Sequence, residues 1–119
     1  MPIIARENAP LLPFNWTPDG EEQVKFKLRG LTTSETLDVQ ALADLDAENK
    51  QMRWTRRAVL AGLQAGLLGW DGFVDAAGKP VAFSSKAVDN IERLGIQLTM
   101  QLFGQIMGAT GLNGEQVKN

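Results

Sequence analysis

Residues 70–85, WDGFVDAAGKPVAFSS, interrupt the chain between two long stretches with helical periodicity. Two short apolar runs, Phe73–Val74 and Pro80–Phe83, flank a polar turn in which Gly78 is free to adopt a positive φ. This pattern predicts a β-hairpin, and the proline places its strand at a sheet edge because proline donates no backbone N–H. We expect three aromatic side chains, termed the hairpin cluster, to hold this segment against the helices: Trp70, Phe73 and Phe83.

Missing residue types narrow the chemistry that the chain can perform. The 119 residues include no Cys, His or Tyr, which excludes disulfides, thiolate nucleophiles, imidazole proton transfer and a phenolic acid. Acid–base chemistry would have to use groups such as Asp71, Asp75 or Lys79 near the hairpin, where a role in the turn is the simpler interpretation of the carboxylates. The sequence therefore predicts no enzyme, no cofactor and no metal site.

Composition is that of one globular domain, with 44% hydrophobic and 22% charged residues. The net charge of −2 gives no broad attraction to nucleic acid or to an anionic membrane. The longest apolar run is far shorter than the roughly 20 residues that span a bilayer. We therefore expect a cytoplasmic protein without a nucleic-acid or membrane partner; self-association is left open.

Prolines divide the chain into two parts. Residues 1–20 contain four of the five prolines and little periodicity, which predicts an irregular N-terminal arm. Residues 21–119 are expected to form a single domain. It opens with the run QVKFKLRG, whose alternation of apolar and cationic residues predicts a half-buried strand with Val24, Phe26 and Leu28 inside.

Three helices are predicted after this strand. The first begins at Thr32, which has capping-box spacing to Glu35. The second extends from Lys50 to Trp70. The third begins at Lys86, is one helix or two with a kink near Gly95, and ends at Gly108 or Gly111. Expected apolar stripes are Leu37, Ala41, Leu42 and Leu45 on the first helix, and Met52, Val59, Leu63 and Leu67 on the second. The predicted fold is therefore mainly α: a small helical domain with a short strand and a β-hairpin insertion.

Glycines recur within the second predicted helix, at positions 62, 66 and 69. Each lowers helix propensity by about 1 kcal/mol relative to alanine. Such glycines either permit another element to pack closely or soften a helix that has to move, and we favour close packing.

Cationic residues surround one tryptophan at the start of this predicted helix. On a helix, steps of three and four residues would make these side chains neighbours. They could form a solvated face that pairs with nearby acidic residues, a contact surface for a protein partner, or, less in keeping with the net charge, a nucleic-acid site. Trp and Arg are frequent at the centre of protein interfaces, so a partner-binding site is the functional hypothesis. Its residues, termed the cationic patch, are Lys50, Arg53, Trp54 and Arg57.

Methionines near the end of the chain raise a similar choice. Met100, Phe103 and Met107 could form an adaptable binding surface, since thioethers repack easily around different partners. We favour the simpler interpretation that they belong to the core.

Three segments together resemble a known family. KFKLRGLTTSE, LLGWDGFVDAAGKPVAFS and a helix opening NIERL, followed by a polar GLNGEQVKN end, resemble the tail assembly chaperones of long-tailed bacteriophages and prophages. The similarity extends from about residue 24 to the end, is most specific from Trp70 to Ser84, and does not cover the proline-rich arm.

The resemblance implies a mainly helical, non-enzymatic protein. Members of that family bind the long tape-measure protein, keep it soluble, and help to recruit tail-tube subunits before they leave the assembled tail. The alternative is a structural or regulatory subunit that stays in a phage tail or another complex. The resemblance transfers no binding residues to this chain.

Overall fold

A computed structural model describes residues 12–46 and 51–111. It shows a mixed α/β domain, so the prediction of a mainly α fold is wrong. In the described residues the strands are β1 (Phe14–Trp16), β2 (Lys25–Leu28), β3 (Asp44–Asp46), β4 (Gln51–Arg53) and β5 (Leu67–Asp71). The helices are α1 (Thr33–Ala41), α2 (Arg56–Gly66), α3 (Ala87–Leu94) and α4 (Ile96–Thr110).

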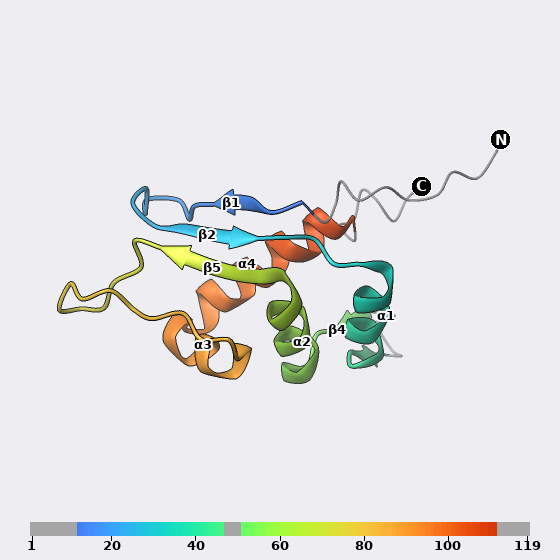
Figure 1. Ribbon diagram of the computed structural model, residues 1–119. Coiled ribbons are helices and arrows are strands. Elements are labelled where there is room, and N and C mark those ends of the chain that lie inside the picture. Colours follow the sequence, from blue (N-terminus) through green and yellow to red (C-terminus); the bar gives the residue numbers. More distant parts are fainter. Residues whose placement is uncertain (1–11, 47–50, 112–119) are drawn as a thin grey trace.

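A three-stranded antiparallel sheet in the order β1-β2-β5 organises the domain (Figure 1). Trp16 and Trp70 both lie opposite Phe26, so these three rings share one face of the sheet. Lys25 and Lys27 point to the other face and are exposed. Helix α4 crosses behind the strands in Figure 1, and its buried side chains join the apolar face of β2 in a single core. One sheet face is therefore packed and the other is solvated.

The predicted strand around Phe26 is confirmed, because Val24, Phe26 and Leu28 are all buried. The predicted helix from Lys50 to Trp70 is wrong at both ends. Gln51–Arg53 pairs with β3 and Leu67–Asp71 pairs with β2, so the helix is limited to Arg56–Gly66. Apolar residues at 63, 67 and 70 imitate helical spacing, yet pairing with β2 satisfies the backbone of β5 and still buries Leu67.

Helix α1 begins as predicted and ends early. The capping box between Thr32 and Glu35 is present, and the last helical residue is Ala41. The predicted apolar stripe is wrong at Leu37, which is 60% exposed, and confirmed at Leu42, which packs partly buried against the core. The buried positions of the helix are Thr36 and Val39. The helix is short, and Val39 alone supplies a fully buried apolar side chain from it.

The prediction of an irregular arm over residues 1–20 is wrong at residues 14–16. Phe14–Trp16 forms β1, the edge strand of the sheet, and both aromatic side chains pack partly buried against the core. Residues 1–11 lie outside the described residues.

Helices α2 and α4 approach each other closely at two glycines. A Cβ atom at Gly62 would lie 2.6 Å from a ring carbon of Phe103, and one at Gly66 would lie 2.5 Å from a methyl carbon of Ile106. Both partners are almost fully buried, so neither has space to move away. The prediction of close packing is confirmed for these two glycines; Gly69 instead lies in β5 with open space beside it.

Alanine substitutions should separate packing from helix propensity. We expect Gly62→Ala and Gly66→Ala each to lower the free energy of unfolding by about 1–3 kcal/mol, because overpacking outweighs the gain in propensity. Gly104→Ala, in open space on α4, should raise it by up to about 1 kcal/mol. Urea denaturation of the three variants measures this, and stabilisation by Gly62→Ala would contradict the close approach.

An ion pair connects the end of β2 to the start of α1. Two guanidinium nitrogens of Arg29 donate to the two carboxylate oxygens of Glu35 at 2.9 and 2.8 Å. Glu35 also accepts the backbone N–H of Thr32 at 2.9 Å. The hydrogen bonds from Arg29 are the main cause that lowers the pKa of Glu35 from 4.5 to about 2, and the Thr32 N–H adds to it.

Stability should therefore depend on pH in the acid range. Because the pKa of Glu35 is lower in the folded state, its contribution is complete above about pH 4.5 and is lost as the pH falls towards 2. We expect Glu35→Gln to cost about 1–2 kcal/mol at pH 7, a value discounted for the partial exposure of the pair. The difference in melting temperature between the two proteins should shrink between pH 4.5 and pH 2; a constant difference would contradict this role.

A glycine separates the last two helices. The predicted kink near Gly95 is confirmed as a full break: its φ of 80° ends α3 and places α4 in a new direction. The end of α4 at Gly111, with a φ of 91°, is also as predicted. In the described part of the chain, no helix combines the length and apolar character needed to cross a membrane.

Candidate functional site

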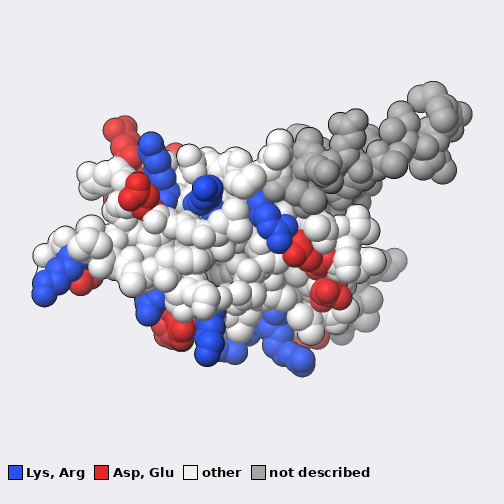
Figure 2. Space-filling model, viewed as in Figure 1, with Lys and Arg blue, Asp and Glu red and all other residues white. Residues whose placement is uncertain are grey.

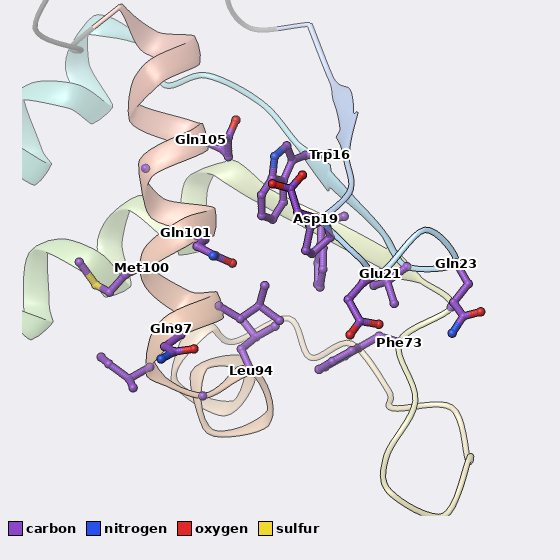
Figure 3. A pocket seen from close by; sticks show the side chains of 18 of the residues that line it. Trp16, Asp19, Glu21, Gln23, Phe73, Leu94, Gln97, Met100, Gln101 and Gln105 are labelled. Carbon is purple, nitrogen blue, oxygen red and sulfur yellow. The ribbon is translucent and has the colours of Figure 1, made fainter.

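An open groove of about 1,140 Å³ lies between the start of α4 and the segment that joins β1 to β2. In Figure 3, Trp16 and Asp19 face Gln97, Gln101 and Gln105 across it. We call this the α4 groove. Its lining is drawn from residues 16–26, 72–74 and 94–105, three segments that only the fold brings together.

Aromatic rings form the base of the α4 groove. Phe26 is fully buried, and the ring centroids of Trp16 and Phe73 lie 6.3 and 5.8 Å from its own. Leu94 and Leu98 complete this apolar surface from the helical side. The base is therefore continuous with the core and rigid.

The helical wall is longer and more polar. Gln97, Gln101 and Gln105 follow one another at four-residue spacing and are exposed, so their amides lie on one side of α4. Between the last two, Gly104 exposes helix backbone, since no atom lies within 4 Å of a Cβ built there. Ile96 is 76% exposed beside the groove, and Met100 is 40% exposed at its outer margin.

Charged groups in the lining are of one sign. Asp19 and Glu21 line the groove from the β1–β2 side, and among the described residues its lining includes no Lys or Arg. Outside the groove, positive and negative side chains are mixed. On the face shown in Figure 2, acidic and basic side chains are interspersed, and neither kind forms a continuous patch.

The cationic patch predicted from the sequence does not lie on one helix. Arg53 ends β4, Trp54 lies in the connection, and Arg57 is in the first turn of α2 behind the capping residue Thr55. Both arginines are exposed. Lys50 lies outside the described residues. The helical-neighbour argument is therefore wrong, although the hypothesis that these residues contact a partner stays a prediction.

Trp54 has a structural contact of its own. Its ring meets the edge of Phe103 at a centroid distance of 5.2 Å, and the tryptophan is partly buried against the core. The same phenylalanine ring fills the notch left by Gly62. Trp54 thus supports the packing of α2 on α4.

Substitution should separate this structural role from a surface role. We expect Trp54→Ala to lower the free energy of unfolding by about 2 kcal/mol, less than for a fully buried tryptophan. Arg57→Glu should change it by no more than about 0.5 kcal/mol, since the side chain is exposed near a helix N-terminus. Chemical denaturation measures both, and a Trp54→Ala variant as stable as the parent would show that the ring is dispensable to the core.

The three rings of the hairpin cluster lie together, although Phe83 is 37% exposed. The ring of Trp70 contacts Phe73 and Phe83 edge-on, at centroid distances of 5.2 and 4.9 Å, and its indole N–H donates to the carbonyl of Val81 at 2.7 Å. The hairpin is reduced to one bridge between Val74 and Pro80, closed by the turn at Gly78 with a φ of 80°. The cluster therefore fixes the segment next to the α4 groove, to which Phe73 also belongs.

Asp75 is a turn residue, as the simpler interpretation of the sequence predicts. Its carboxylate accepts the backbone N–H groups of Ala77 and Lys79 at 2.9 and 3.0 Å. Within residues 12–46 and 51–111, no three acidic side chains gather closely enough to hold a metal ion.

Sequence reasoning missed the α4 groove. The four-residue spacing of Gln97, Gln101 and Gln105 was the one available signal, and it indicates only a polar helix face. Phe103 and Met107 are buried, which confirms the core interpretation for them, while Met100 is half exposed.

Comparison of the chain with models of known protein families, with curated proteins and with solved structures found no match.

Proposed function

We propose that this protein is a non-enzymatic chaperone of phage tail assembly that binds the tape-measure protein through the α4 groove. It acts in the host cytoplasm, keeps the tape-measure protein soluble, and is absent from the mature virion. The resemblance of residues 70–84 and their flanking segments to tail assembly chaperones supports this function. The α4 groove supplies a surface suited to it.

The observation that supports the proposal is the α4 groove itself, in which the partly buried rings of Trp16 and Phe73 lie near the exposed side chain of Ile96. A groove of about 1,140 Å³ exceeds the roughly 300–1,000 Å³ of small-molecule pockets, so a polypeptide segment suits it better. Exposed Ile96 and the rings of Trp16 and Phe73 offer apolar contact to such a segment. Tape-measure proteins are long and helical with apolar stripes, which aggregate unless they are covered before assembly.

Co-expression with the tape-measure protein tests the function directly. The wild-type protein should raise the soluble fraction of the tape-measure protein after centrifugation. Purified virions should lack the chaperone, whereas a structural subunit would be present in them. Failure of the wild-type protein to change that solubility would overturn the proposal.

A single charged substitution should identify the binding surface. We expect Ile96→Glu to weaken binding about tenfold or more, because it places a carboxylate on an apolar contact surface. The fold should be unaffected, since Ile96 is 76% exposed and begins α4, where negative charge is favourable. Soluble fraction and circular dichroism are measured together.

Leu37→Glu is the matched control, because it makes the same kind of change at an exposed leucine of α1 outside the groove. Leu37→Glu should solubilise the tape-measure protein like the parent. If Ile96→Glu also does so while an Arg53→Glu, Arg57→Glu variant does not, binding belongs to the cationic patch instead.

A further inference from the structure

The charges in the α4 groove restrict what can occupy it. Asp19 and Glu21 lie on one wall, and within residues 12–46 and 51–111 the lining includes no cationic side chain to neutralise them. A bound segment without positive charge would bring these carboxylates into a less polar environment with no compensation. An occupant with Lys or Arg at this wall would instead gain two complementary charges.

The wall opposite favours a helix over an extended strand. Backbone groups in the middle of α4 are already paired within the helix, so an added strand would find no ladder of free N–H and C=O groups there. A helical occupant satisfies its own backbone and needs only side-chain contacts. Gln97, Gln101 and Gln105 provide amides that both donate and accept hydrogen bonds along this wall.

Gly104 provides a position for close approach. Within the domain, Gly62 and Gly66 of α2 receive large apolar side chains of α4. Gly104 lines the α4 groove and, unlike the two buried glycines of α2, is exposed as an open notch with nothing within 4 Å of a built Cβ. A large apolar side chain of a second helix fits such a notch in the way that Phe103 fits the notch at Gly62.

We infer, on the basis that the α4 groove is the binding site proposed above, that its occupant is an amphipathic helix of the partner with a basic flank. The helix lies along α4 between Gly95 and Gln105, a length of about 15 Å at 1.5 Å per residue. Its apolar stripe covers the aromatic base and reaches Gly104, and its Lys or Arg residues face Asp19 and Glu21.

Synthetic peptides test this without the natural partner. The probe is an alanine-based helix of about 18 residues with a leucine stripe flanked by lysines, long enough to be helical in water. Two comparison peptides keep the leucine stripe: one replaces the lysines with glutamates, and the other carries two central prolines. Fluorescence anisotropy should show binding of the lysine helix, with affinity at least about tenfold weaker for each comparison peptide.

Two charge-matched variants locate the effect. Asp19→Asn combined with Glu21→Gln should weaken binding of the lysine helix about three- to tenfold at low salt and remove most of its salt dependence. Asp38→Asn combined with Glu92→Gln changes the net charge equally at two exposed carboxylates outside the groove, and should bind like the parent.

A third variant tests the shape of the groove. Gly104→Gln should weaken binding of the lysine helix, because its side chain fills the notch at this glycine.

Each result decides one point. Equal binding of the glutamate helix, or equal weakening by both double variants, would overturn the basic flank. Equal binding of the proline peptide would overturn the helix. If the Asp19, Glu21 variant still solubilises the tape-measure protein while Ile96→Glu does not, the proposed function stands and the charge assignment falls. If the wild-type protein does not act on the tape-measure protein, the proposed function falls, and the peptide measurements still decide the groove's preference.

Discussion

The close crossing of α2 and α4 is the constraint on which the rest of the structure depends. Because Gly62 and Gly66 have no side chains, Phe103 and Ile106 of α4 pack directly against the backbone of α2. This contact sets the position of α4, and α4 then covers the apolar face of the sheet. A larger residue at either of these two positions would push α4 away from α2 and from the core around Phe26. Glycine lowers the helix propensity of α2, so the gain lies entirely in tertiary packing.

Sequence patterns predicted those parts of the fold that local chemistry decides. The alternation around Phe26 matches a sheet with one buried face, and the capping box at Thr32 and Glu35 forms as its spacing indicates. Glycines 62 and 66 were correctly interpreted as packing sites. The extent of the second helix could not be obtained in this way, because Leu67 and Trp70 fit helical spacing and strand pairing equally well. Only the presence of β2 as a partner decides in favour of the strand.

The candidate site was beyond prediction for a related reason. Its walls are separated by some 70–90 positions in the chain. Its polar wall is built from ordinary residue types, which include glutamines, glycines, an isoleucine and two carboxylates. None carries a chemical signature by itself, unlike the Trp and Arg residues of the cationic patch that attracted the functional hypothesis. Trp54 instead packs on Phe103, which shows that a tryptophan among arginines can belong mainly to the core.

The position of α4 at the end of the described chain has a consequence for biosynthesis. Strands β1 and β2 are made first, yet Leu102, Phe103 and Ile106, which complete the core that β2 enters, belong to the last helix. The backbone N–H of Leu31 likewise donates to the hydroxyl of Thr110, 79 positions later, at 2.8 Å. Contacts of such long range form late and slow the folding of a domain. A nascent chain that has not reached α4 therefore carries an uncovered sheet face, and this protein is itself prone to aggregation until its last helix emerges.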